Sequence, residues 1–384
     1  MKVAVLGYGT VGAGVYSMLS DAPGMEAGPV LVRPGKAVES FMVSDAALIF
    51  GDPTVDAVVE TLGGLDPAYS YGMRALEAGK HFITANKAMV AAHGLELAAL
   101  AREKGAAFLF SAACGGGVPF LHNLALSAET DRIEAVSGIL NGTTNYMLDA
   151  MQRRSLSYGD ALREAQSLGY AESDPTADVS GLDALRKMQL ACAVAFGVLP
   201  QSGMLCEGME HFTAADVEDI QSRGLVCRLT ARGSRAGESV SAYVEPVLFP
   251  RAAPESSVFT NNNMARYTGK RCGSIVLLGQ GAGRFPTASA VLRDLSAAQQ
   301  GARSMFPENC RAAEADNREA VHSYYIRTGG LAAVRLSLRS VLAPGEVVRA
   351  VTEPMSAEKM HALAQNIRKD GNDLFFAALE EELC

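Results

Sequence analysis

Residues 1–14 read Met-Lys-Val-Ala-Val-Leu-Gly-Tyr-Gly-Thr-Val-Gly-Ala-Gly. Lys2 to Leu6 form a short apolar run typical of a buried β-strand. After the glycines, a helical pattern continues through Val15 and Leu19. The stretch therefore predicts a strand, a tight turn and a helix.

The turn has the spacing Gly-x-Gly-x-x-Gly at Gly7, Gly9 and Gly12. The first glycine permits the turn, the second lets the backbone approach a pyrophosphate, and the third lets the helix meet the sheet. The helix start at Thr10 and Val11 would then face the phosphates. We predict that a dinucleotide binds here, with a purely structural turn as the alternative.

Strands and helices alternate over the rest of the N-terminal third. The strand runs lie at 30–32, 55–60, 81–84 and 107–110, and the helical patterns between them at 69–78 and 93–104. Such alternation predicts an α/β fold with a Rossmann-type doubly wound parallel sheet. After residue 128 the alternating run 133–140 is typical of an antiparallel sheet instead.

The second strand ends at Arg33, where an acidic residue would hold the ribose of NAD. A guanidinium suits the 2′-phosphate of NADP. We therefore expect NADP(H) to be preferred over NAD(H), with a solvated strand end as the alternative.

These changes of pattern divide the chain into four parts. We expect an NAD(P)-binding domain over 1–128, an α+β substrate-binding and dimerisation domain over 129–278, a return loop and helix that pack on the first domain over 279–300, and a linker with a small α+β tail over 301–384.

Composition excludes several classes of protein. With 48% hydrophobic and 20% charged residues, the chain can fill globular cores. Its 34 Lys and Arg against 42 Asp and Glu give a net charge of −8, which disfavours nucleic acid and anionic membranes as partners. The seven cysteines are scattered without a Cys-x-x-Cys pair, and neither a secretory segment nor a long apolar run is present. We expect a cytoplasmic protein with reduced thiols.

Three further motifs follow in one order. Ala85-Asn86-Lys87 comes first, residues 138–146 read Gly-Ile-Leu-Asn-Gly-Thr-Thr-Asn-Tyr, and residues 168–187 read Leu-Gly-Tyr-Ala-Glu-Ser-Asp-Pro-Thr-Ala-Asp-Val-Ser-Gly-Leu-Asp-Ala-Leu-Arg-Lys. Over residues 1 to about 295 the chain resembles the homoserine dehydrogenase family. The resemblance implies NAD(P)H-dependent interconversion of L-aspartate 4-semialdehyde and L-homoserine, a step towards threonine and methionine, by a homodimer.

Reduction of an aldehyde leaves a developing alkoxide, which needs a nearby cation and a proton donor. Lys187 lies four residues after Asp183 on an expected helix, so the pair shares one face. Lys87 lies in an expected strand-to-helix loop at the carboxyl edge of the sheet. Two lysines near one carbonyl would lower each other's pKa. The resemblance implies that Lys187 donates the proton and that Lys87 is a second active-site cation.

Acidic residues crowd the segment before Lys187. The resemblance implies that Glu172 and Asp183, with Lys87, contact the substrate and that Asp178 supports Lys187. From the residues alone, a solvated loop and helix start is the alternative. The expected cofactor contacts are Gly7, Gly9, Thr10, Val11, Gly12, Arg33, Thr61, Lys87, Gly169 and Gly281.

The resemblance also implies a sodium or potassium ion on main-chain carbonyls near residue 115. The candidates are Ser111, Cys114, Gly116 and Val118. Ser111 stands where the family often has an acid. Cys114 has no base in its motif, and hydride transfer requires no covalent step, so we expect an inert thiol.

The C-terminal tail departs most from the family pattern. Residues 324–327 resemble the first strand of an ACT-type amino-acid-binding module, but the expected Pro-Gly-x-Leu helix start is missing. We expect a degenerate or divergent regulatory tail. Two other functions stay open: a dehydrogenase acting on another amino acid such as aspartate, and an NADP-binding sensor without catalysis.

Overall fold

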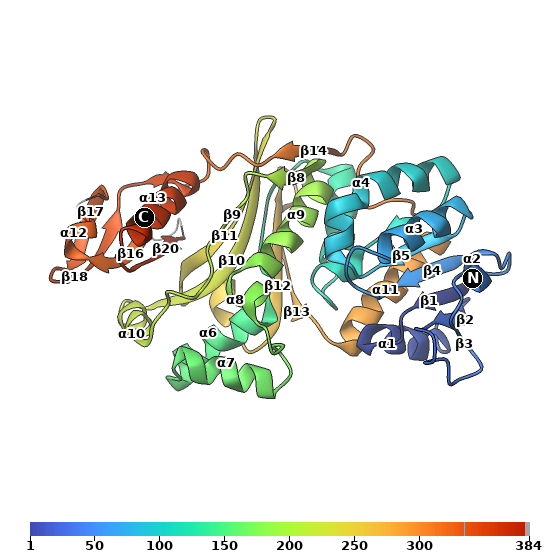
Figure 1. The fold of residues 1–384 in the computed structure, drawn as a ribbon. Helices are drawn as coiled ribbons and strands as arrows, with labels where there is room; N and C mark the ends of the chain where they lie inside the picture. The colour runs from blue at the N-terminus through green and yellow to red at the C-terminus, as the bar shows by residue number, and fades with distance from the viewer. Residues whose placement is uncertain (334, 381–384) are drawn as a thin grey trace.

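The opening strand and helix form in the computed structural model, which describes residues 1–333 and 335–380. β1 spans Lys2–Leu6 and α1 spans Thr10–Leu19. β1 lies inside a parallel sheet of order β3-β2-β1-β4-β5-β6, at the right of Figure 1. The other strands of this sheet are β2 (Glu26–Leu31), β3 (Met42–Val43), β4 (Ala57–Glu60), β5 (His81–Thr84) and β6 (Phe108–Leu109). The Rossmann-type fold class is confirmed.

The strands β2 and β4 pair with opposite edges of β1, so the strand order reverses at β1. Right-handed crossovers then place α1 on one face and α3 (Ala68–Glu77) and α4 (Lys87–Lys104) on the other. The return helix α11 (Arg284–Gln299) packs beside α1. In such folds a ligand binds at the carboxyl ends of the strands where the order reverses, which are β1 and β4 in this sheet.

The second large sheet is mixed and has the order β13-β12-β7-β10-β11-β20-β16-β18-β17. Its first strands are β7 (Ile133–Ile139), β10 (Leu225–Ala236), β11 (Ser239–Pro250), β12 (Asn262–Gly269) and β13 (Gly273–Gln280). Helices α6 (Gly142–Arg154) and α9 (Leu182–Phe196) pack against it. The neighbouring helices are α5 (Phe120–Thr130), α7 (Tyr158–Ser167), α8 (Thr176–Val179) and α10 (Ala214–Ser222).

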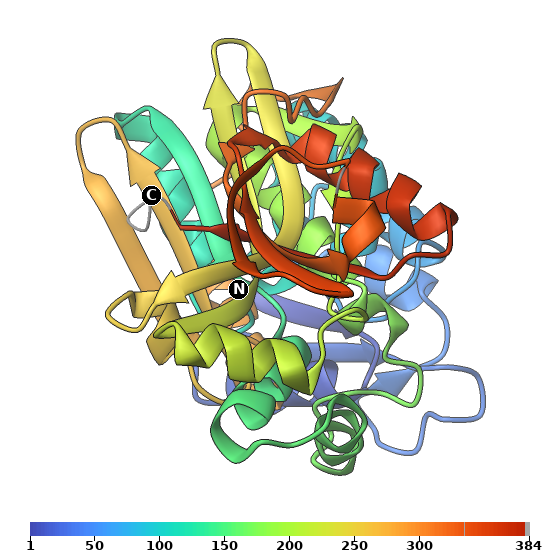
Figure 2. The ribbon, with the colours of Figure 1, turned by 90° about the vertical axis from the view of Figure 1, so that its left-hand side faces the viewer.

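The tail is an α+β unit whose strands continue the middle sheet, because β20 (Leu374–Leu379) pairs in parallel with β11. Figure 2 shows the tail, in red, in front of the long β10–β11 hairpin, in yellow. Its other elements are β15 (Val321–His322), β16 (Tyr324–Gly329), α12 (Gly330–Ala333), β17 (Leu338–Ala343), β18 (Val347–Thr352), β19 (Met355–Ser356) and α13 (Ala357–Lys369). The short α12 stands where the helix-start signal is missing.

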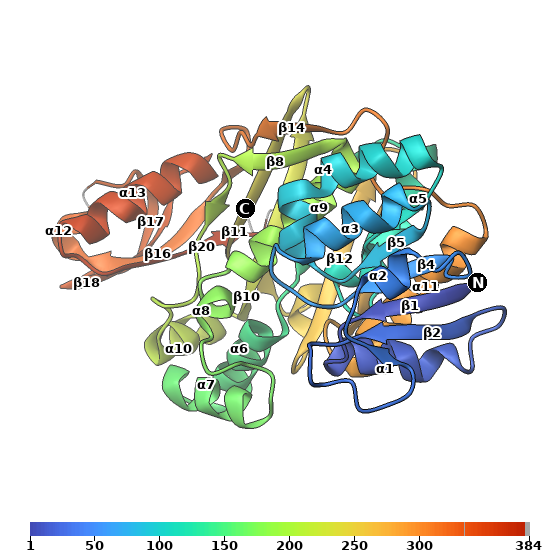
Figure 3. The same ribbon diagram turned by 45° about the vertical axis from the view of Figure 1, so that its right-hand side comes forward.

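Several expected boundaries differ from the structure. The helix expected from residue 93 begins at Lys87, because Asn86 caps it by accepting a hydrogen bond from the Met89 N–H group. The expected linker contains β14 (Arg311–Glu314), which pairs with β8 (Val198–Ser202) across the top of Figure 3. The divisions expected at 128 and 278 fall inside α5 and β13. Among the described residues, the helices are too short or too polar to cross a membrane.

Candidate active site

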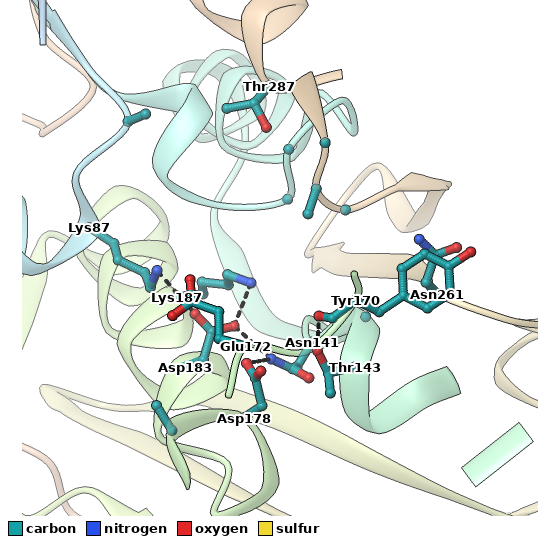
Figure 4. A pocket seen from close by; sticks show the side chains of 18 of the residues that line it. Lys87, Asn141, Thr143, Tyr170, Glu172, Asp178, Asp183, Lys187, Asn261 and Thr287 are labelled. Atoms are coloured by element: carbon teal, nitrogen blue, oxygen red, sulfur yellow. Dashed lines mark hydrogen bonds and ion pairs between the residues drawn. The ribbon is translucent and has the colours of Figure 1, made fainter. Parts of the chain in front are cut away.

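A cavity of about 610 Å³ lies between the parallel sheet and the mixed sheet. The start of α4 supplies Lys87, and α9 supplies Asp183 and Lys187 (Figure 4). Asn141, the cap residue of α6, lies at its floor, and the loop 281–283 lines the side towards the parallel sheet. The cavity thus brings together groups from both halves of the molecule.

Lys187 is held by two acceptors. Its Nζ donates to the Leu140 carbonyl at 2.6 Å and to Asp183 Oδ2 at 2.7 Å. The predicted contact between Asp183 and Lys187 across one helical turn is confirmed. Lys87 Nζ lies 3.1 Å from Asp183 Oδ1, so one carboxylate connects the two lysines. Only 12% of the Lys187 side chain is exposed.

Asn141 completes this network. Its side-chain amide donates to Asp178 Oδ1 at 2.7 Å and to Asp183 Oδ2 at 2.9 Å, while its Oδ1 accepts from the Thr144 N–H group. Asp178 therefore acts on Lys187 through Asn141, and its negative charge also favours the protonated form of Lys187. The sequence analysis missed Asn141, although a polar residue just before a helix is a recognisable cap signal.

The pKa values differ from the expectation for two facing lysines. Burial alone would lower the pKa of Lys187, but the adjacent Asp183 carboxylate outweighs it and raises that pKa. Burial opposes ionisation of Asp183, yet Lys187 and Lys87 hold its pKa well below the usual range. The expected mutual lowering of the lysine pKa values is wrong for Lys187, because a carboxylate lies between the two cations. Burial raises the pKa of Asp178.

Glu172 and Gly169 lie on the loop between α7 and α8 and line the same cavity. Glu172 is exposed, so its carboxylate is free to meet a ligand. Gly169 has a φ of 74° and follows the cap of α7, which accounts for a glycine there without a ligand. Tyr170, on the same loop, and Asn261 lie on the side of the cavity away from Lys87 (Figure 4).

The glycine turn lies at the carboxyl end of β1. A Cβ atom on Gly12 would lie 2.1 Å from the Gly7 carbonyl oxygen, whereas one on Gly9 would meet nothing within 4 Å. The Thr61 hydroxyl donates to the Leu6 carbonyl at 3.0 Å and so joins β4 to the turn. Arg33 is exposed after β2. The open surface at Gly9 leaves room for a ligand to approach the start of α1.

The loop after β6 contains the candidate ion ligands. The Ser111 carbonyl accepts from the Cys114 N–H group at 3.2 Å, and the Val118 carbonyl accepts from the Phe120 N–H group at 2.7 Å. Burial raises the pKa of the Cys114 thiol to about 12, which agrees with an inert thiol. A positive charge is already present, because the Arg293 guanidinium contacts the Gly117 carbonyl at 3.4 Å. Two of the four candidate carbonyls, those of Ser111 and Val118, thus each accept one hydrogen bond within the chain.

A buried acid that the sequence analysis missed faces this loop. Asp294 of α11 accepts from the Ser111 hydroxyl at 2.5 Å and from the Ser111 N–H group at 2.8 Å. Burial raises the pKa of Asp294 to about 7. Position 111 has no acid of its own, but Asp294, 183 residues later in the chain, places a carboxyl group beside it. The sequence signal for Asp294 was an acidic residue within the mostly apolar pattern of α11.

Gly116 and Gly281 bring the two cavity loops together. A Cβ atom on Gly116 would lie 2.4 Å from the Gly281 carbonyl oxygen, and one on Gly281 would lie 2.0 Å from the Asn263 side chain. Close packing alone therefore requires glycine at both positions.

A parallel sheet with a glycine turn after β1, next to a cavity lined by two lysines that share one carboxylate, is typical of a class of proteins, the dehydrogenases that use a nicotinamide cofactor. A family model described as homoserine dehydrogenase matches residues 119–296, and one described as the NAD binding domain of homoserine dehydrogenase matches residues 7–111. The chain belongs to the homoserine dehydrogenase family, and its function is that of a homoserine dehydrogenase.

Individual relatives agree. The homoserine dehydrogenase of Synechocystis sp. is 37% identical over 319 residues, which cover 77% of this chain and 72% of that protein. That of Corynebacterium glutamicum is 38% identical over 314 residues, covering 76% and 70%. The crystal structure of a homoserine dehydrogenase from Thiobacillus denitrificans matches with a TM-score of 0.87 at 29% identity, over 99% of this chain and 98% of that one. A non-catalytic sensor and a dehydrogenase of another amino acid are thereby set aside.

Proposed function

We propose that Lys187 is the proton donor when this chain reduces L-aspartate 4-semialdehyde to L-homoserine. The observation that carries the proposal is the Lys187 ammonium, which faces the cavity while Leu140 and Asp183 fix its position. A bound nicotinamide cofactor would supply the hydride. The chain supplies the proton and stabilises the negative charge that develops on the substrate oxygen.

Each charged residue has a distinct task in this proposal. The Asp183 carboxylate keeps Lys187 protonated and turns both lysines towards the same space. Lys87 adds a second positive charge near the developing alkoxide. Glu172, with Asp183 and Lys87, binds the amino-acid part of the substrate, and Asp178 holds Asn141 against the lysine network.

Replacing Lys187 by Ala tests the assignment. Without its general acid the enzyme should lose about 100-fold or more in kcat. The Kd for NADPH should change less than twofold, because the proposed role of Lys187 is towards the substrate oxygen and not towards the cofactor. Isothermal titration with NADPH and steady-state rates measure the two quantities. An equal loss of NADPH affinity would contradict the proposed role.

We further propose that NADP(H) is preferred over NAD(H). Arg33 supports this, since it is exposed at the end of β2, where the ribose of a dinucleotide lies in such folds. Arg33→Ala should weaken NADPH more than NADH, as measured by Kd. An unchanged ratio of the two affinities would assign the 2′-phosphate to other residues. The remaining cofactor contacts proposed are Gly7, Gly9, Thr10, Val11, Gly12, Thr61, Lys87, Gly169 and Gly281.

A sodium or potassium ion at Ser111, Cys114, Gly116 and Val118 stays a prediction. An ion there would share the Ser111 and Val118 carbonyls with N–H donors of the chain and would lie near the Arg293 guanidinium, which contacts the Gly117 carbonyl. Rates of homoserine oxidation in sodium, potassium and tetramethylammonium buffers test it. A rate that needs one of the small ions would restore the prediction.

A cytoplasmic homodimer completes the proposal. On β13, Val276 is 41% exposed and Leu278 is 60% exposed, which gives the middle sheet an apolar outer edge. Sedimentation equilibrium should give twice the mass of the 40.3 kDa chain. If the Leu278→Lys variant still sediments with twice the mass of one chain, the dimer contact does not depend on Leu278.

A further inference from the structure

An ion pair joins the tail to the middle domain close to the α8–α9 segment of the proposed active site. Arg368 of α13 donates to both carboxylate oxygens of Glu207, at 2.9 and 2.6 Å. The same guanidinium donates to the Leu374 carbonyl of the tail at 2.8 Å. The side chain of Glu207 is 10% exposed and that of Arg368 is 20% exposed, so water reaches only a small part of the pair, and its planar, two-bond geometry is specific.

Glu207 belongs to a short segment, residues 206–209, that lies against the corner between α8 and α9. The Met209 N–H group donates to the Val179 carbonyl at 2.9 Å, and the Cys206 thiol donates to the Ser180 carbonyl at 3.1 Å. A Cβ atom on Gly208 would lie 2.3 Å from the Val179 carbonyl oxygen. The segment and the corner are therefore in direct backbone contact.

This corner carries the acids of the proposed site. Asp178 is the residue before Val179 on α8, and Asp183 lies in the first turn of α9. Gly181 between them has a φ of 83°, and a Cβ atom there would lie 3.1 Å from the Cys206 sulfur. The direction in which α9 begins, and with it the position of Asp183, thus depends on the fit against residues 206–209.

We propose that Arg368 is a positioning residue for the active site. By holding Glu207, it keeps residues 206–209 against the α8–α9 corner and so fixes Asp178 and Asp183 relative to Lys187. The inference rests on the proposed roles of these acids. In this proposal the tail contributes to catalysis without binding an effector.

Two kinetic variants test the inference in the full-length chain. Arg368→Met keeps the apolar part of the side chain and removes the charge, and Glu207→Gln removes its partner. Each should lower kcat/KM for L-homoserine by about 5- to 50-fold, since small displacements of reacting groups are costly. The NADPH Kd should stay within twofold. The double variant should lose no more than either single variant, because both remove one interaction.

Tyr325→Phe is the matched control. Its hydroxyl donates from the tail to Asp219 of α10 at 2.9 Å, which is a similar tail-to-core bond that does not touch residues 206–209. This variant should keep kcat/KM within twofold of the parent. An equal loss in Tyr325→Phe and Arg368→Met would overturn the inference in favour of general loosening of the tail.

Hydrogen exchange supplies a readout that does not need activity. In Arg368→Met, amides of peptides covering residues 176–190 should exchange faster, while peptides of β1 and α1 should be unchanged. If Asp183→Asn and Asp178→Asn retain full activity, the proposed function of the acids fails. If they lose activity while Arg368→Met leaves both kcat/KM and exchange unaltered, only the further inference fails.

Discussion

At the scale of the residue, the site depends on how one carboxylate is shared. Asp183 accepts from Lys187, faces Lys87 and accepts from Asn141, so three donors of the chain surround its carboxylate. Such a carboxylate is a poor base, because all of these groups stabilise its charge. The proton that moves in the reaction therefore belongs to Lys187 in our proposal, and Asp183 sets the pKa of that lysine.

The pH dependence should reveal this control. Because Asp183 raises the pKa of Lys187, homoserine oxidation, which needs the neutral amine, should speed up as pH rises towards and beyond the usual lysine value of about 10.4. In Asp183→Asn, burial dominates, lowers the pKa of Lys187 and shifts the rate profile to lower pH. Profiles of kcat/KM between pH 6 and about 10.5 measure the shift.

Asp174→Asn is the control for that experiment. Asp174 lines the same cavity, but it is exposed and bonds to Thr176 rather than to a lysine. Its profile should match the parent. A profile of Asp183→Asn that is unmoved, or moved to higher pH, would refute control of Lys187 by Asp183.

The buried Asp294 should make stability depend on pH. Its folded-state pKa of about 7 lies above the usual 3.8, so the folded state holds a proton that the unfolded state has released between those values. The stability that Asp294 contributes is present below pH 4 and is lost as pH rises to about 7, by up to about 4 kcal/mol.

Replacing Asp294 by Asn should remove that dependence. The difference in unfolding free energy, Asn variant minus parent, should therefore grow from pH 5 to pH 7.5, and chemical denaturation at both values measures it. The Ser111 contacts set a constant offset, so the slope is the decisive quantity. A difference that stays flat would show that Asp294 is already ionised when folded.

At the scale of the element, the turn between β1 and α1 contains glycines for two different reasons, close packing and the approach of a ligand. Gly12 is required by packing, since a side chain there would overlap the Gly7 carbonyl. Gly9 has open space around it, so the fold itself would accept alanine. A requirement for glycine at position 9 must then come from a bound ligand that approaches the backbone.

Two alanine variants should respond differently. Gly12→Ala should lower the Tm and weaken NADPH together, because it displaces α1 from the sheet. Gly9→Ala should keep the Tm of the parent yet weaken NADPH at least tenfold. Thermal unfolding without cofactor and titration with NADPH give the two readouts. If Gly9→Ala binds NADPH as tightly as the parent, the pyrophosphate does not bind at this turn.

At the scale of the whole molecule, the tail is part of the structure rather than an appendage. Val247 and Phe249 of β11 are buried in a core that also contains Tyr324, Phe376 and Met360 of the tail. The chain therefore folds its last strand back into the sheet of the middle domain. Function and stability of the core should both depend on residues that follow position 320.

Removing residues 321–384 should expose that apolar core and the edge of β11. Loss of several buried side chains, at about 2 kcal/mol each, predicts a Tm lower by roughly 10 °C or outright aggregation. Arg335→Gln, which breaks only an exposed ion pair within the tail, should behave as the parent. A truncated chain that stays monodisperse with the parental Tm would mean that the core is complete without the tail.

The parallel sheet, the glycine turn and the pairing of Asp183 with Lys187 could be predicted from the amino-acid sequence, because they depend on spacing along one strand, turn or helix. Only the tertiary structure decided what depends on residues distant in sequence. It placed Lys87 on the other side of Asp183, Asp294 against Ser111, and Arg368 against Glu207. The pKa of Lys187 was mispredicted for this reason, since the sign of the shift depends on whether a carboxylate or a second cation lies nearer.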